Sequence, residues 1–158
     1  QIFYVQFGGY DNHGELLDNH EALLGNLDAD LKAFWDSLVE LGVEDQVTLF
    51  TASDFGRTLR SNGQGTDHAW GGNSLVLGGC VKGGQIFGHY PDDSEMRIGQ
   101  GLDVGFNGRI LPTTSCDEYF AELALWFGLP PGELEEVFPN LDRFYGYAPE
   151  TAPLGFLL

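Results

Sequence analysis

The strongest constraint on the fold is the order of an apolar run, a long amphipathic helix and a second apolar run. The first run, 2–7, is rich in β-branched and aromatic residues, as buried strands are. Residues 16–42 repeat apolar side chains at steps of three and four and end at Gly42, a typical helix terminator. The second apolar run covers 47–52. This order predicts a right-handed βαβ unit, and so an α/β fold with a parallel or mixed sheet flanked by helices.

Shorter elements are predicted further along the chain. They are a strand at 74–77, a hairpin over 81–87, a helix over 116–127 and a short helix over 132–137. Residues 113–115 are N-cap candidates for the longer of these helices, which Gly128 ends. Residues 62–73 and 90–108 are rich in glycine and polar residues and predict loops. The aromatic tail from Phe138 onward is expected to pack back on the domain.

The net charge limits the partners of this protein. The chain has 158 residues and a net charge of −17, with only seven lysines plus arginines. Such an acidic surface repels phosphate backbones and anionic membranes, so no nucleic-acid partner is expected. No segment predicts insertion into a membrane or a signal peptide, and the chain begins inside an apparent strand without methionine, as a mature or truncated product would. Cys80 and Cys116 match no metal-binding spacing and form either one disulfide or two buried thiols.

Three parts of the chain offer residue types that bind metals or anions. They are Asp11 with His13, Asp54 with Arg57, and Asp67 with His68. The first two pairs follow predicted strands, and ligands of open α/β sheets bind outside the carboxyl ends of strands. Carboxylate oxygens and neutral imidazole nitrogens are suitable ligands for one or two divalent metals. The guanidinium of Arg57 is a candidate for a bidentate contact to an anionic group.

Each of these residues also has a purely structural interpretation. The three acids can cap turns or a helix, Arg57 can pair with a neighbouring acid, and the imidazoles can be solvated. The remaining histidines, His20 and His89, are expected to be ordinary helix and loop residues. Ser53 follows a predicted strand, but no base at useful spacing supports it as a nucleophile, and the common nucleophile and phosphate-binding motifs are absent from the sequence.

Several segments of the chain match a known family in the same order. They are QFGGYDNH, TASDFGRT, GTDHAWGG, GGCVKGGQIFG, GRILPTTSCDEY and the final VFPNL. On these segments the chain resembles the bacterial domain-of-unknown-function family fifteen-oh-one over nearly its whole length. That family is placed in the alkaline phosphatase and sulfatase-like superfamily of metal-dependent hydrolases. The resemblance implies the C-terminal part of an alkaline phosphatase-like domain, so that 1–158 is either a single domain or a C-terminal fragment of a larger one.

The resemblance also implies roles for individual residues. Asp11 and His13 match the first acid–imidazole ligand pair of the superfamily. His68 matches a later histidine ligand of the same metal, with Asp67 beside it as a further ligand or a supporting residue. Asp54 matches a position that is usually glutamate in the family and is a candidate ligand for a second metal.

Two departures from the superfamily pattern affect the expected activity. Superfamily phosphatases often carry a histidine directly after the acid of the second metal, whereas Phe55 stands here. The Ser, Thr or Cys nucleophile and the first metal-binding acid lie upstream in the superfamily, outside the present chain. The missing N-terminal half, or another chain, is therefore an expected partner.

Together these observations predict a metal-dependent hydrolase of phosphate or sulfate esters, acting on a small-molecule or polymer ester. Zinc is the first candidate metal, with manganese and calcium as alternatives, and Arg57 would bind the substrate anion. The alternative is a secreted, non-catalytic binding module that keeps the fold, with or without a structural metal. Many family members carry a twin-arginine export signal, which implies a periplasmic or extracellular location.

Overall fold

Helix α1 (Leu16–Leu41) is the longest element of the chain and confirms the helix predicted over 16–42. It ends at Gly42, whose φ of 66° is left-handed and whose N–H bonds back to the last turn of the helix. The structure is a computed structural model and describes residues 1–143 and 152–157. None of its described helices is both long and apolar enough to cross a membrane.

The elements after α1 are short. In chain order they are β1 (Thr48–Phe50), β2 (Gly56–Ser61), β3 (Thr66–Ala69), β4 (Val76–Gly78), α2 (Cys116–Phe127) and α3 (Leu134–Val137). β1 and β4 confirm the strands predicted over 47–52 and 74–77, and α2 has the bounds predicted from the sequence. β2 and β3 occupy residues for which the sequence predicts no strand.

The strands form two antiparallel ladders, β1 with β4 and β2 with β3. Leu49 of β1 lies opposite Leu77 of β4, and Arg57 of β2 lies opposite His68 of β3. The chain thus combines helices with small sheets, but the predicted parallel or mixed sheet is not found among the described residues. The reason is local: the β2–β3 hairpin reverses the chain between β1 and β4, so these two strands meet in opposite directions.

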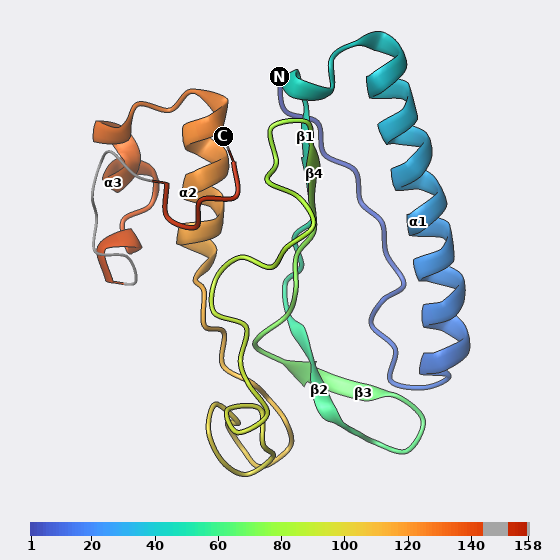
Figure 1. Ribbon diagram of the computed structural model, residues 1–158. Helices are drawn as coiled ribbons and strands as arrows, with labels where there is room; N and C mark the ends of the chain where they lie inside the picture. The colour runs from blue at the N-terminus through green and yellow to red at the C-terminus, as the bar shows by residue number, and fades with distance from the viewer. Residues whose placement is uncertain (144–151, 158) are drawn as a thin grey trace.

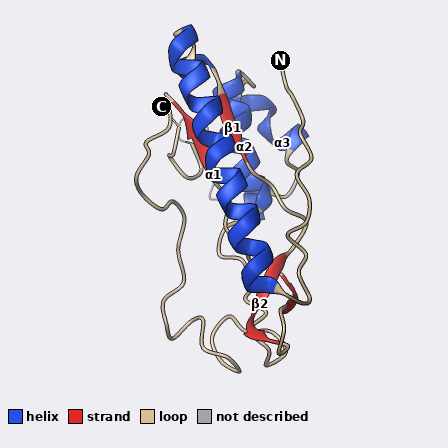
Figure 2. Cartoon of the chain, turned by 90° about the vertical axis from the view of Figure 1, so that its right-hand side faces the viewer, coloured by secondary structure: helices blue, strands red, loops and turns tan. Residues whose placement is uncertain are grey.

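The N-terminal segment, residues 1–7, is not the buried strand that the sequence predicts. It runs back along the length of the molecule to the start of α1 (Figures 1 and 2). Its backbone makes no hydrogen bond to another described residue, and Phe3 and Val5 are 83% and 84% exposed. An apolar, β-branched sequence favours an extended backbone, but a strand exists only where a neighbour supplies the ladder of hydrogen bonds.

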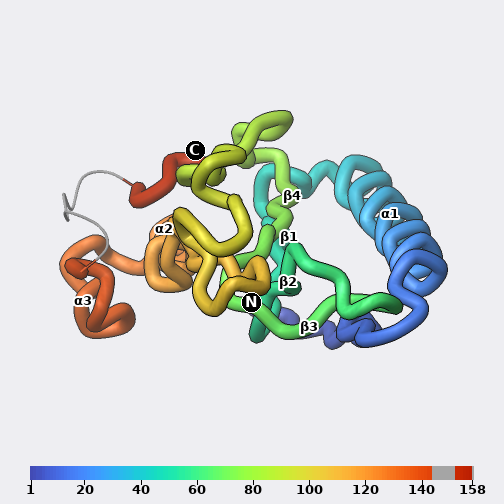
Figure 3. The backbone as a smooth tube through the Cα atoms, turned by 90° about the horizontal axis from the view of Figure 1, so that it is seen from below, coloured from blue at the N-terminus to red at the C-terminus, as the bar shows by residue number. Residues whose placement is uncertain are grey.

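The buried core surrounds α2 rather than α1. Figure 1 shows α1 on one side of the strands and α2 with α3 on the other, and Figure 3 shows the same order from below. One face of α2 packs Ala121 against Leu134 and Leu141, and the other packs Leu123 against Phe156 and Leu157. Because α2 packs on two sides, it contains three buried residues in a row, whereas α1 buries a single one.

The start of α2 confirms the predicted cap. The hydroxyl of Ser115 accepts a hydrogen bond from the backbone N–H of Glu118, and the Glu118 carboxylate accepts one from the N–H of Ser115. This reciprocal arrangement is a capping box, which satisfies donors that the first helical turn leaves unpaired. Tyr119 in the first turn donates from its hydroxyl to the carbonyl oxygen of Thr51, which ties α2 to the end of β1. Burial raises the pKa of that phenol to about 12.

Four smaller expectations have definite outcomes. The hairpin predicted over 81–87 is wrong: Val81 forms an isolated antiparallel bridge with Leu157, so this stretch pairs with the C-terminal segment and not with itself. The loop predicted over 90–108 is confirmed, since it contains no helix and no strand. Cys80 and Cys116 form no disulfide, but they are not two buried thiols either, since Cys116 is exposed. The tail packs back on the domain at Leu141 and at 156–157, while 144–151 and 158 lie outside the described residues.

The exposed N-terminal segment predicts self-association of the isolated chain. The accessible surface is 10670 Å², against about 7,800 Å² for a compact monomer of this mass. Because contiguous apolar surface is stabilised by leaving water, replacing Phe3 and Val5 by serine should reduce both the binding of an apolar-surface dye and the light scattering at high concentration severalfold. The matched control replaces Ile86 and Phe106, which are 70% and 73% exposed but lie in separate loops. Equal effects of the two pairs would refute a special role for the segment.

Candidate metal centre

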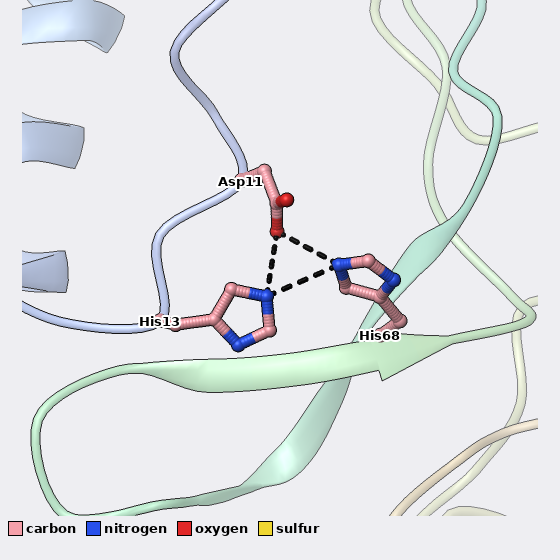
Figure 4. Close-up of side chains that lie close together, drawn as sticks. All are labelled: Asp11, His13 and His68. Carbon is pink, nitrogen blue, oxygen red and sulfur yellow. Dashed lines mark hydrogen bonds and ion pairs between the residues drawn. The ribbon is translucent and has the colours of Figure 1, made fainter.

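The candidate site lies where the loop before α1 crosses the β2–β3 hairpin. Asp11 and His13 come from the loop, and His68 comes from β3 (Figure 4). Two backbone hydrogen bonds tie the loop to the hairpin: the N–H of Thr66 donates to the carbonyl oxygen of Asn12, and the N–H of Leu16 donates to that of Gln64, each over 3.2 Å. Residues more than 50 positions apart in the sequence are thereby brought to one place.

Three ligand atoms converge at this crossing. The Oδ1 atom of Asp11 lies 3.1 Å from Nε2 of His13 and 3.0 Å from Nε2 of His68. The two Nε2 atoms are 3.1 Å apart. Two ligands of a tetrahedral zinc ion, each about 2.0 Å from the metal, stand about 3.3 Å apart, so this triangle is close to the size that such an ion requires. Among the described residues, no other group of at least three acids, histidines or cysteines brings one ligand atom from each within 4.8 Å of all the others.

The charges of this triangle also favour a cation. A carboxylate oxygen and two imidazole nitrogens are electron-rich, so they repel one another unless a proton or a metal ion lies among them. Partial desolvation acts to raise the pKa of the Asp11 carboxyl, but hydrogen bonds from Arg57 and His68 outweigh it, and the pKa lies below its usual value. Asp11 is therefore a carboxylate at neutral pH, which is the form that binds metals.

The triangle is open to solvent. The side chains of Asp11, His13 and His68 are 49%, 50% and 51% exposed. A structural metal site is usually closed, with four protein ligands, whereas a catalytic site keeps a position for water or substrate. In number and exposure, the three candidate ligands resemble the protein ligands of the second kind of site.

Arg57 holds the two parts of the site together. Its Nε donates to the hydroxyl of Thr66 over 3.0 Å, and its Nη2 donates to the carbonyl oxygens of Asn12, over 2.9 Å, and Thr66. Its Nη1 forms an ion pair with Asp11. The guanidinium thus links β2, β3 and the loop, and one N–H of Nη1 has no partner among the described residues. The sequence predicts an anion-binding role for Arg57, whereas most of its N–H groups bond to residues of the loop and of β3.

Asp67 lies on the far side of the His13 ring. Its Oδ1 is 3.2 Å from Nδ1 of His13 and 3.1 Å from the amide nitrogen of Asn62. Hydrogen bonds from Asn62 and from His13 lower the pKa of the Asp67 carboxyl. The structure therefore places Asp67 beside a ligand, not within the triangle, although the sequence also offers it as a direct ligand.

Asp54 is not brought to the triangle. It is exposed and makes no hydrogen bond or ion pair with another described residue. The next residue, Phe55, instead stacks on the ring of His68, with the ring centroids 3.9 Å apart and the planes at 17°. The aromatic ring of Phe55 thus limits the orientations that His68 can adopt.

A comparison with known families identifies the chain at this point. The family described as protein of unknown function (DUF1501) matches residues 1–105. The chain belongs to this family. The part that matches DUF1501 includes every residue of the triangle and of its surroundings described above. No curated protein and no solved structure matches the chain.

Sequence reasoning missed two residues that support the triangle in this DUF1501 protein, Asn62 and Thr66. Both lie in the glycine-rich stretch that the sequence assigns to a loop, so nothing marked their side chains as partners. The Asn-Gly dipeptide at 62–63 is a typical hairpin turn signal and could have revealed the β2–β3 hairpin. The other histidines lie apart, as expected: the ring of His20 packs edge-on against Tyr10, and His89 pairs with Glu95.

Proposed function

We propose that Asp11, His13 and His68 bind one divalent metal ion, with zinc as the first candidate and manganese or calcium as alternatives. The convergence of one carboxylate oxygen and two Nε2 atoms within 3.1 Å of one another carries this proposal. The mixed nitrogen and oxygen donor set suits zinc, and calcium would prefer oxygen donors alone.

We further propose that the metal serves hydrolysis of phosphate or sulfate esters. When bound, such an ion supplies a Lewis acid that polarises an ester oxygen and stabilises charge on the attacking or leaving oxygen. The exposed triangle leaves room for a substrate, and the uncommitted N–H of Arg57 offers a contact to its anionic group. The reaction class itself comes from the resemblance to the alkaline phosphatase and sulfatase-like superfamily, as do a periplasmic or extracellular location and a partner segment that supplies the nucleophile.

One observation favours the alternative, a secreted binding module that keeps a structural metal and has no catalytic activity. Asp54 stands apart from the triangle, and Phe55 stacks on His68. The described residues thus assemble ligands for one metal, whereas many phosphatases of the superfamily use two. The binding module would recognise a polymer or a partner protein and would hydrolyse neither phosphate esters nor sulfate esters.

The metal content of the purified protein tests the first part of the proposal. After incubation with zinc, manganese or calcium and removal of the excess, we expect close to one ion per chain by elemental analysis. The double variant His13→Ala, His68→Ala should lose it, because a single carboxylate binds such ions weakly. Asp54→Asn is the control and should retain the metal. A parent protein that takes up none of the three ions would refute the metal centre.

Hydrolysis of p-nitrophenyl phosphate and p-nitrophenyl sulfate tests the second part. An ester hydrolase should release nitrophenol from one of them when loaded with metal, and the double histidine variant should not. A protein that binds the metal stoichiometrically but hydrolyses neither p-nitrophenyl phosphate nor p-nitrophenyl sulfate would support the binding module.

A further inference from the structure

We propose that Asn62 and Asp67 are positioning residues that hold the His13 imidazole with Nε2 directed at the metal. This inference rests on the proposed metal centre and assigns Asp67 a role behind the ligand and not on the ion. It concerns a hydrogen-bonded chain of three side chains, from Asn62 through Asp67 to His13.

The orientation of the Asn62 amide is determined by the turn in which it lies. Its Oδ1 accepts hydrogen bonds from the backbone N–H groups of Gln64, over 3.1 Å, and Gly65, over 2.8 Å. Because only the oxygen of an amide can accept them, its NH₂ group must point the other way. There it donates to the Asp67 carboxylate and to the carbonyl oxygen of His13, each over 3.1 Å.

The Asp67 carboxylate in turn selects the form of the His13 ring. An ionised carboxylate can only accept, so the hydrogen bond of 3.2 Å between the two groups has its proton on the Nδ1 atom of His13, while the other nearby carboxylate, Asp11, is hydrogen-bonded to His68. In the neutral ring, Nε2 is then left with a free lone pair, which points at Asp11 and His68. The contact therefore favours the tautomer that can bind a metal through Nε2.

Asn62 also restrains the backbone of the same ligand. Its NH₂ group holds the His13 carbonyl oxygen and the carboxylate behind the His13 ring at the same time. A half-exposed imidazole would otherwise rotate about its side-chain torsions, and binding a metal would cost that freedom. Residues that orient a histidine ligand in this way typically change metal affinity about 10- to 100-fold when they are removed.

The test uses two variants that keep the shape of the site. Asn62→Asp retains the oxygen that caps the turn but replaces the donors to Asp67 by a second acceptor. Asp67→Asn keeps an oxygen within reach of the His13 ring and of Asn62, which share the Oδ1 atom, but removes the negative charge that favours a proton on Nδ1 of His13. Asp54→Asn is the control, because this exposed acid makes no hydrogen bond or ion pair with another described residue. All proteins carry the full chain, and their folding is compared by circular dichroism before the binding measurements.

Two measurements follow on each protein. Zinc affinity is measured by competition with a chromophoric chelator, and we expect it to fall about 10- to 100-fold in both variants and to stay unchanged in the control. The tautomer of His13 is measured in metal-free protein by ¹⁵N NMR at a pH at which the ring is neutral, with its signals assigned from the His13→Ala variant. We expect the form protonated at Nδ1 in the parent and in the control, and the form protonated at Nε2 to gain population in both variants.

The outcomes separate this inference from the proposed function. Unchanged zinc affinity and an unchanged His13 tautomer in both variants would overturn the positioning role. Reduced affinity without a change of tautomer would also overturn it, because it would assign Asp67 to direct coordination or to folding. A parent that takes up none of zinc, manganese and calcium would overturn the metal centre, while its His13 tautomer would still decide whether Asn62 and Asp67 select the form of the ring.

Discussion

Replacing Glu122 by alanine should destabilise this protein by about 3 to 5 kcal/mol. Glu122 lies in the middle of α2 and is 1% exposed. Its carboxylate accepts three backbone hydrogen bonds of 2.7 Å, from the N–H groups of Leu154, Gly155 and Leu157. The alanine variant would leave one buried and two partly buried donors without this partner, and a fully buried donor without a partner costs about 1 to 3 kcal/mol.

The Glu122→Ala substitution should destabilise the packing of the C-terminal segment first. Residues 152–157 reach the core through these bonds and through the side chains of Phe156 and Leu157, which pack against Leu123. Urea unfolding followed by tryptophan fluorescence would measure the change, since Trp126 packs against the same cluster. Glu122→Gln keeps one acceptor oxygen and should lose about half as much free energy.

An exposed acid provides the control for this prediction. Glu135 of α3 is exposed, and Glu135→Ala should change the free energy of unfolding by less than about 0.5 kcal/mol. If Glu122→Ala unfolded at the same urea concentration as the parent, the three hydrogen bonds would contribute nothing to stability, and the anchoring role of Glu122 would be refuted.

The Gly65→Ala substitution should disrupt the metal centre, although Gly65 is not a ligand. A Cβ atom at this position would lie 2.6 Å from the backbone carbon of His13 and 2.9 Å from the backbone nitrogen of Gly14. These are backbone atoms, so no side chain can rotate away, and the ligand loop has to move off the hairpin. We expect a loss of about 1 to 3 kcal/mol in stability and a fall of at least about 10-fold in zinc affinity.

A second glycine near the site offers a matched control. Gly8 precedes the ligand loop, has no atom within 4 Å of its would-be Cβ, and does not have a positive φ. Gly8→Ala should leave zinc affinity unchanged in the same chelator competition. Zinc affinity that is equal in the parent and in Gly65→Ala would show that the close contact between the loop and the hairpin does not position His13.

The helices could be predicted from the sequence because their signals are local. The apolar steps of α1, its terminal Gly42, and the Ser115 cap with Glu118 each depend on residues within one or two turns. The N-terminal segment shows the limit of such signals. Its composition favours an extended backbone, but a strand forms only by pairing with a second strand, and the local sequence does not show whether one lies beside it.

The candidate site, too, could be predicted from the sequence only in part. The sequence singles out Asp11, His13 and His68, because these residue types follow glycine turns and because they match a family pattern. It offers Asp54 and Asp67 with equal strength, since their chemistry is the same. Only the crossing of the loop over the β2–β3 hairpin separates them: it brings three atoms together, puts Asp67 behind His13, and leaves Asp54 in solvent.

The sequence by itself therefore determined the helices, the acidic character and the candidate ligands of this DUF1501 protein. Tertiary structure alone decided which candidates meet, because a hydrogen bond or an ion pair acts over a few ångströms in space whatever the separation along the chain. For the same reason the sequence does not reveal the stabilising role of Glu122, because nothing local distinguishes it from the other acids of the helices. Its role exists only because the C-terminal segment returns to α2 and presents three N–H groups to its carboxylate.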